Sequence, residues 1–170
     1  MGLPRRLKHF NVFHQGVSYF GDCEEIALPK VAVKLDDYAG AGMPGAVGID
    51  TGQVENLEIE HTYGGLVFEI FKEFGITKID GVLLRFAGSY QRDDTGEVDA
   101  VEITVRGRHA EMDPGKAKAG DKTEFKVKSR LSYYKLTVNG KDLIEIDLVN
   151  FIFNVDGTDR LAEHRKAIQK

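Results

Sequence analysis

Apolar and polar residues alternate with a period of two through most of this sequence, and this pattern constrains the fold more than any other feature. Residues 57–63, 82–86, 101–106 and 125–131 place apolar or aromatic side chains mainly at every second position. Because successive side chains of a strand point to opposite faces of a sheet, these segments predict half-buried β-strands. The polar side of the first segment is acidic, whereas that of the last is basic.

One segment departs from this pattern and predicts a helix. Over residues 66–75 the apolar side chains fall at the spacing of a single helical stripe, and Gly75 ends the run. A helix of about nine residues is marginal alone, so we expect it to lie on the sheet. A weaker amphipathic segment at 161–168 indicates a second, C-terminal helix.

The dipeptide Asn139-Gly140 predicts a β-hairpin, because a two-residue type I′ turn needs positive φ at both central positions. Regular pairing around that turn sets Leu136 opposite Leu143, Tyr133 opposite Ile146 and Lys135 opposite Ile144. Both faces of this hairpin are therefore expected to be partly apolar.

These segments amount to about eight strands and one good helix, and few helices separate the strands. The predicted fold class is mainly β: an antiparallel β-barrel or sandwich with one flanking α-helix and long inter-strand loops. A single domain over residues 1–170 is expected from the length. Its predicted parts outside the sheet are an N-terminal arm (1–9), an extended loop (36–52), the helix (66–75) and a C-terminal tail (159–170).

The overall charge and the cysteine content narrow the functional classes. A net charge of −4 argues against a general duplex-binding protein, because phosphate neutralisation needs a basic surface. The single cysteine, Cys23, permits no internal disulfide and favours an intracellular, reducing origin. We expect no signal peptide and no membrane-spanning segment, because the sequence contains no apolar run of about 20 residues.

A glycine-rich passage between Tyr38 and Asp50 shows neither helical nor strand periodicity up to Val47. Residues 40–45 match the pattern G-x-G-x-x-G, but a dinucleotide site needs a helix directly after the glycines, and here strand-like residues follow. We therefore interpret the passage as an exposed contact loop. The apolar residues Tyr38, Met43 and Val47 within it favour contact with another molecule.

The sequence outlines no catalytic or metal centre. Its five histidines include no i, i+4 pair and no cysteine partner at zinc spacing, so we interpret them as structural or surface residues. Cys23 has no nucleophile signature around it. Acidic pairs such as Asp36-Asp37 point to opposite faces of a strand, which does not suit acid–base catalysis. We accordingly expect no enzyme activity, no cofactor and no bound metal.

Taken together, residues from Asn11 to about Arg165 resemble the major tail tube protein of contractile-tailed phages and R-type pyocins. The positions that carry this resemblance keep the order and spacing of the family. They include Asn11, Phe13, Gly16, Ser18-Tyr19, Gly21, Leu28-Pro29-Lys30, Lys34, Tyr38, Gly42-Met43, Asp50, Gly52, Arg106-Gly107, Asp113, Gly115, Lys118, Gly120, Tyr133-Tyr134-Lys135-Leu136, Ile146-Asp147, Asn150, Asp156-Gly157, Asp159 and Arg165.

The resemblance implies a small β-barrel or sandwich that closes into hexameric rings, which stack into a hollow tube inside a contractile sheath. The implied partners are further copies of the chain, the sheath protein, the tape-measure protein, and the baseplate and tail-terminator proteins. DNA is implied only as non-specific passing cargo. The implied location is the tail tube of a virion, assembled in the cytoplasm of the bacterial host.

Two groups of residues are candidates for specific roles in such a tube. The ring-stacking loop, which we expect to act with the N-terminal arm, contains Asp37, Tyr38, Gly40, Gly42, Met43 and Asp50. The lumen-facing candidates are Glu58 and Glu60, because an acidic lumen repels phosphate and keeps DNA from adhering.

Three other functions stay open at this point. A tube protein of the type VI secretion kind is a related structural alternative, separable by its gene neighbours. A small-ligand-binding β-barrel is distinguished by remaining monomeric at high concentration and by ligand-dependent melting. An enzyme is the least supported alternative, because the histidines and the lone cysteine outline no site.

Overall fold

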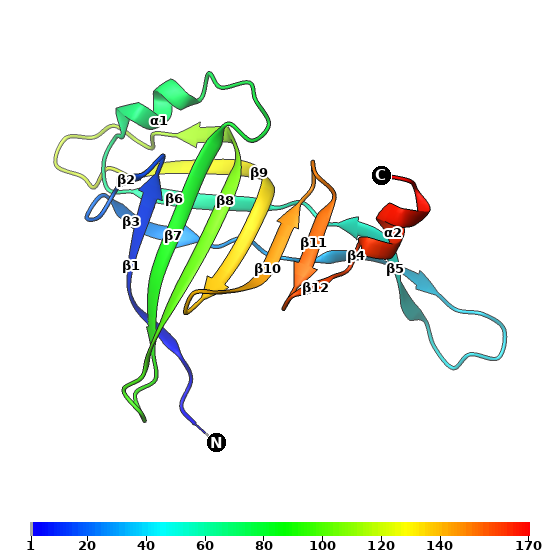
Figure 1. Cartoon of the computed structure of the whole chain (residues 1–170). Helices are drawn as coiled ribbons and strands as arrows, with labels where there is room; N and C mark the ends of the chain where they lie inside the picture. Colours follow the sequence, from blue (N-terminus) through cyan, green and yellow to red (C-terminus); the bar gives the residue numbers. More distant parts are fainter. Residues whose placement is uncertain (1) are drawn as a thin grey trace.

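The computed structural model describes residues 2–170, so Met1 of the predicted N-terminal arm lies outside the described residues. Within this range the chain forms twelve strands and two short helices (Figure 1). The elements are β1 (Arg6–His14), β2 (Val17–Ser18), β3 (Cys23–Ala27), β4 (Val33–Tyr38), β5 (Val47–Val54), β6 (Glu58–Tyr63), α1 (Phe68–Glu73), β7 (Val82–Gln91), β8 (Val98–Asp113), β9 (Phe125–Val138), β10 (Lys141–Asp147), β11 (Ile152–Val155), β12 (Thr158–Asp159) and α2 (Ala162–Ala167).

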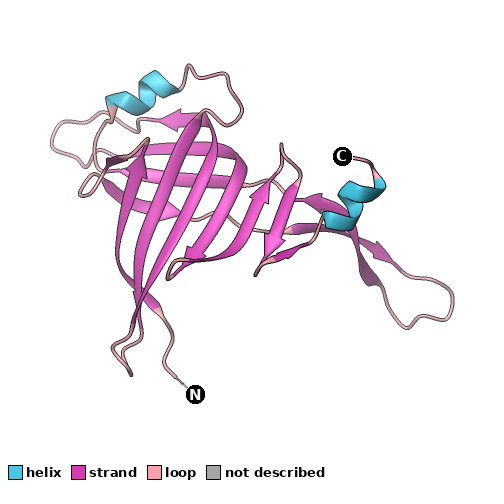
Figure 2. Ribbon diagram, in the orientation of Figure 1, coloured by secondary structure: helices cyan, strands magenta, loops and turns pink. Residues whose placement is uncertain are grey.

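Ten of these strands belong to one antiparallel sheet, in the order β12-β11-β10-β9-β8-β7-β1-β2. The remaining two strands are β6 and β3. Strand β6 pairs with β9 on one side and with β3 on the other. The long strands form one layer in Figure 2, and β3 and β6 cross behind them. The predicted fold class is confirmed in its sandwich form, because the described strands do not close into a barrel.

Strand β9 belongs to both layers, and an irregularity in its middle makes this possible. Residues 125–130 pair with β6, whereas residues 133–138 pair with β10. Between these halves the register with β8 shifts, so that Arg106 faces Tyr133 and Gly107 faces Leu131. A Cβ atom on Gly107 would lie 2.0 Å from the Arg130 carbonyl oxygen, so only glycine fits at this corner.

Two apolar clusters fill the interior. The larger lies between the layers and the smaller lies under α1, where Ile70 is fully buried. The larger contains Val12, Leu57, Ile59, Val82, Leu84, Phe86, Ile103, Val105, Leu131, Tyr134, Ile146 and Phe153. The smaller contains Tyr19, Tyr63, Val67, Ile70, Phe125 and Val127. More than half of these core residues are alternating apolar side chains of the predicted strands.

The predicted turn at Asn139-Gly140 is confirmed, with φ values of 50° and 82°. The predicted register beyond it is wrong. A bulge at Leu143 shifts the pairing by one residue, so that Leu136 faces Ile144 and Tyr134 faces Ile146. A bulge adds one unpaired residue to one strand, which an alternation pattern does not reveal.

The boundaries of three predicted parts need correction. The arm 1–9 extends into β1, which begins at Arg6. The predicted loop 36–52 is mostly a β-hairpin, because β4 and β5 pair from Tyr38 and Val47 outward and leave only residues 39–46 as a loop. The helix predicted over 66–75 is six residues long, and the tail 159–170 carries the equally short α2. Neither helix in the described chain is long and apolar enough to cross a bilayer.

Candidate assembly interface

The β4–β5 hairpin, hereafter the arm hairpin, projects away from the body of the sheet (Figure 1). None of its strand residues is buried, and it forms a two-stranded sheet of its own. Several of its exposed residues are apolar: Leu35, Tyr38, Met43, Val47 and Ile49. An isolated two-stranded hairpin is marginally stable in water, and an exposed apolar surface of this kind marks an interaction site.

The structure brings four of the six predicted ring-stacking residues together at the tip of the arm hairpin. The Met43 backbone N–H donates to the Gly40 carbonyl over 3.2 Å, and Gly42 has a φ of 87°. A Cβ atom on Gly40 would lie 3.1 Å from the Tyr38 hydroxyl, so the loop folds back over this ring. The fifth predicted residue, Asp37, lies next to this tip on β4 and pairs with Gly48 on β5.

The sixth predicted residue, Asp50, lies nearer the base of the arm hairpin and has a different contact. Its carboxylate accepts a hydrogen bond of 3.2 Å from Arg160, just before α2. A small cavity at this base lies between Val33, Leu161 and His164. Asp50 therefore ties the arm hairpin to the C-terminal segment instead of contributing to its tip.

The N-terminal residues are held against the turn between β7 and β8. The Arg5 guanidinium donates to Asp99, which Asn139 also contacts at 3.0 Å. These two hydrogen bonds hold the pKa of the Asp99 carboxyl below its usual range. Lys8 pairs with Asp93 at 2.9 Å. The predicted N-terminal arm is thus held against its own chain at Arg5 and Lys8.

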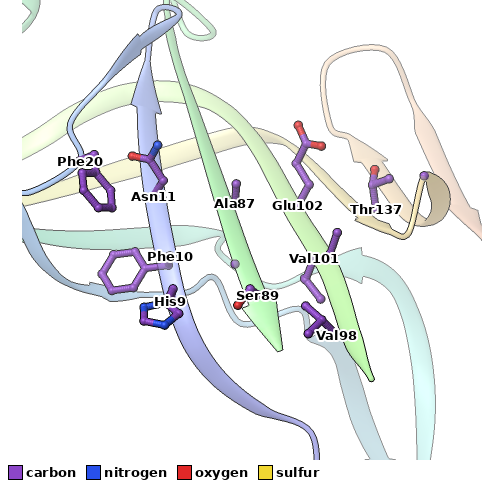
Figure 3. A pocket seen from close by; sticks show the side chains of 13 residues that line it. His9, Phe10, Asn11, Phe20, Ala87, Ser89, Val98, Val101, Glu102 and Thr137 are labelled. Atoms are coloured by element: carbon purple, nitrogen blue, oxygen red, sulfur yellow. The ribbon is translucent and has the colours of Figure 1, made fainter. Parts of the chain in front are cut away.

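An apolar groove of about 420 Å³ runs over the outer face of β1, β7 and β8 (Figure 3). Phe10 lies along it, and Phe20, which is 79% exposed, stands at its edge. Val98 and Val101 lie on the opposite side. This groove is a second exposed apolar surface, distinct from the arm hairpin.

The lumen-facing candidates Glu58 and Glu60 lie on the outer face of β6, and each has a basic neighbour on β9. Glu58 lies 3.6 Å from Arg130, and Glu60 lies 3.9 Å from Lys128. The acidic and basic strand faces noted in the sequence are therefore side by side. The negative charge on this surface is locally compensated.

Helix α1 exposes apolar side chains on its outer side. Phe68 is 65% exposed and Phe74 49%, whereas Ile70 is buried. The predicted single buried stripe is thus only partly correct, because Leu66 and Phe74 remain about half exposed and Phe71 is 36% exposed. Phe71 stacks on Phe125 with ring centroids 4.8 Å apart, which fixes the helix while leaving its outer side apolar.

Beneath α1 lies a buried polar group that sequence reasoning missed, hereafter the histidine cluster. It comprises His14, His61, His109, Glu73, Ser129 and Tyr63. Burial lowers the pKa of His14 and of His109 to about 4 and that of His61 to about 3. Burial, with the nearby charge of Glu69, raises the pKa of Glu73 to about 7. The imidazoles are therefore neutral near pH 7.

One signal of this cluster is present in the sequence. His61 occupies an inward position in the alternation of 57–63, where the other side chains are apolar or aromatic. The remaining histidines lie on other strands, so their proximity depends on the tertiary fold.

The profile of the phage tail tube protein FII family matches residues 4–168. The chain belongs to this family. It is 46% identical to the tail tube protein of Escherichia phage P2 over 170 residues, covering 99% of both chains. It is also 40% identical to the major tail tube protein of Serratia phage KSP20, over 92% of this chain and 91% of that protein. The resemblance that the sequence motifs indicate is thereby confirmed.

Solved structures show the same fold as this tail tube family member. One is a chain of the PVC sheath-tube complex of an extracellular contractile injection system in the extended state, with a TM-score of 0.58 over 79% of this chain and 91% of that one. A chain of the PVC sheath/tube terminator matches with a TM-score of 0.59, over 79% of this chain and 96% of that one. Sequence identities of 12% and 11% make these likenesses of fold.

Proposed function

We propose that this chain is the structural subunit of the inner tube of a contractile phage tail, where it forms hexameric rings that stack into a hollow conduit. The observation that carries this proposal is the arm hairpin. It extends beyond the body of the sheet, exposes Tyr38 and Met43 near its tip, and buries none of its strand residues within its own chain. Contact with a subunit in the next ring would cover this surface.

Unpaired sheet edges support ring formation within one layer of the tube. Strands β2, β3 and β12 each pair with a single neighbour among the described strands, so backbone donors and acceptors remain open at three edges. Side-by-side copies related by a closed rotation would pair or cover such edges, whereas an open arrangement would leave them free to aggregate. The exposed groove and the outer side of α1 offer further apolar area for these contacts.

We place Glu58 and Glu60 on the wall of the channel. Their compensated pairs with Arg130 and Lys128 give that wall a polar, weakly charged surface. Such a surface offers few unpaired cations to DNA phosphates, so passing DNA would not adhere. In a resolved tube, these two carboxylates on the outer wall would overturn this assignment.

The expected partners follow from the tube's position in a contractile tail. They are the sheath outside, the tape-measure protein inside during assembly, and the baseplate and tail-terminator proteins at the two ends. DNA is cargo of the finished tube. Assembly is expected in the cytoplasm of the bacterial host, and the finished tube is a part of the virion tail.

Self-assembly of the purified full chain tests the proposal. We expect rings or rods when the protein is concentrated, measured by size-exclusion chromatography with light scattering and by negative-stain microscopy. A variant with residues 39–46 replaced by Asn-Gly should keep the hairpin and lose rod formation, because the contact loop is absent. Gly45→Ala is the matched control, since a Cβ atom there meets nothing within 4 Å. A native chain that stays monomeric at every concentration would overturn the proposal.

A further inference from the structure

Three side chains of the histidine cluster direct potential metal ligands at one point. His14 comes from β1, Glu73 from α1 and His109 from β8, and their ligand atoms all lie within 4.8 Å of one another. Glu73 Oε2 lies 2.7 Å from His14 Nε2 and 3.2 Å from His109 Nε2. The two imidazole rings stack with a 15° interplanar angle, so both present Nε2 toward the same carboxylate.

The His14 imidazole supplies an independent observation. The residue is 1% exposed, and its Nε2 makes no hydrogen bond with any described residue despite the short approach to Glu73. A buried polar atom without a partner is costly, and the large majority of such atoms in folded proteins are satisfied. A cation bound between His14 and Glu73 would satisfy this nitrogen.

The residues behind His109 are arranged as a metal's outer shell would be. His109 Nδ1 lies 2.8 Å from Ser129 Oγ, which lies 3.2 Å from His61 Nε2, and His61 Nδ1 lies 2.7 Å from the Tyr63 hydroxyl. If His109 Nδ1–H donates to Ser129, then Ser129 donates to His61 and His61 donates to Tyr63. This order leaves the lone pair of His109 Nε2 free for a cation and fixes the ring orientation.

We propose that His14, His109 and Glu73 form a binding site for a divalent transition metal, with Zn²⁺ as the best-fitting ion. Two imidazole nitrogens and one carboxylate oxygen are ligands that Zn²⁺ accepts, and water can take the fourth position. Tetrahedral coordination at about 2.0–2.1 Å requires ligand atoms about 3.3 Å apart. The contact between Glu73 and His109 already has this separation, whereas that between Glu73 and His14 must open slightly.

The position of Glu73 gives the site access to solvent. The Glu73 side chain is 17% exposed, which gives a water ligand and an entering ion a path from solvent. The bound ion would join α1 to two strands and hold this short helix in place.

Metal binding to the purified full chain tests the inference. After removal of metal with EDTA, Zn²⁺ should bind at one ion per chain, measured by elemental analysis after desalting. Co²⁺ in place of Zn²⁺ should give the visible absorption of a four-coordinate ion. Free Zn²⁺ at a hundredfold excess over Kd should raise Tm by about 5–10 °C, because ligand binding to the native state stabilises it.

Matched variants separate this site from surface binding. Glu73→Gln and His14→Gln should remove the bound ion and the cobalt spectrum, whereas Glu69→Gln on the same helix and His164→Ala on the exposed α2 should keep both. Circular dichroism of Glu73→Gln verifies that loss of metal is not loss of fold. Absence of stoichiometric binding by the native chain, or binding that survives Glu73→Gln, would show that the cluster is a hydrogen-bonded polar core only. Either result leaves tube assembly untouched, because the arm hairpin does not contribute to the cluster.

Discussion

The α1 end of the molecule and the arm hairpin both expose aromatic side chains, yet they are built in different ways. Under α1, Ile70 and Phe125 are fully buried, and the histidine cluster links α1 to four strands. In the arm hairpin no strand residue is buried, and Tyr38 remains 55% exposed. One surface rests on a core of its own chain, whereas the other has no core behind it.

This difference separates the residues that determine folding from those available for assembly. A side chain that is already exposed contributes little to the stability of the isolated chain, because it loses no contact on unfolding. Substitutions in the core and at the sheet corner should therefore change unfolding, and substitutions in the arm hairpin should change polymerisation. The following experiments test whether folding and assembly depend on different residues. They are given from the largest to the smallest expected effect on the free energy of unfolding of the isolated chain.

Gly107→Ala should have the largest effect. The added methyl group would lie 2.0 Å from the Arg130 carbonyl oxygen, so the corner where β9 changes layers must move. We expect a loss of about 3 kcal/mol in the free energy of unfolding, or about 6–12 °C in Tm. Gly45→Ala at the tip of the arm hairpin is the control and should leave Tm unchanged. Equal melting of the two variants would contradict the assigned register of β8 and β9.

Tyr63→Phe should come next. The variant removes only a hydroxyl group, but it leaves His61 Nδ1 without its 2.7 Å partner in a fully buried site. The expected cost is about 1–3 kcal/mol, measured by urea denaturation of the metal-free chain. Tyr38→Phe makes the same chemical change in the arm hairpin and should alter stability by less than about 0.5 kcal/mol. If Tyr63→Phe costs as little stability as Tyr38→Phe, water must reach the histidine cluster and replace the lost hydroxyl group.

Asp99→Asn should destabilise the chain in a pH-dependent way. The hydrogen bonds from Asn139 and Arg5 lower the pKa of Asp99 in the folded state, so its contribution is present above the unfolded pKa and is lost as pH falls through the folded value. Native chain and variant should therefore differ at pH 7 and converge in strong acid, measured by denaturant unfolding across pH. Asp50→Asn, which breaks an exposed pair at the arm hairpin, should have a smaller effect at pH 7.

Much of the fold could be read from the sequence, because alternation is a local pattern. The inward residues of β6, β8 and β9, the Asn139-Gly140 turn and the position of α1 were all predictable in this way. The arm hairpin was not, since Asp36-Asp37 and Gly48 interrupt the alternation of its two strands. Bulges such as that at Leu143 also escape a pattern that counts every second residue.

The tip of the arm hairpin and the histidine cluster also differ in how far the sequence alone predicts them. The tip of the arm hairpin is a continuous segment, so Tyr38, Gly40 and Met43 could be grouped from sequence spacing alone. The histidine cluster combines residues 14, 61, 73 and 109, which are brought together only by the pairing of β1, β6 and β8 with their neighbours and by the docking of α1. Because these residues are far apart in the sequence, no local spacing predicts that they lie close together.

Tyr38→Asp and Met43→Asp should change assembly strongly and folding hardly at all. Both side chains are exposed in the isolated chain, so we expect the free energy of unfolding to shift by less than about 0.5 kcal/mol. A buried carboxylate at a ring contact is unfavourable, and normal tubes should therefore be absent in negative-stain micrographs. Tubes of normal length from both variants would exclude the arm hairpin as the stacking contact.

Glu58→Gln and Glu60→Gln should also have little effect on stability. Their ion pairs with Arg130 and Lys128 are partly exposed and longer than 3.5 Å, and such surface pairs contribute about 0–1 kcal/mol. A double-mutant cycle of Glu58→Gln with Arg130→Gln should give a coupling energy below about 0.5 kcal/mol that decreases with added salt. If these residues line the channel, the single variants leave Lys128 and Arg130 uncompensated and should retain DNA on preformed tubes at low salt. Retention of DNA by tubes of the native chain would show instead that the paired carboxylates do not shield this wall.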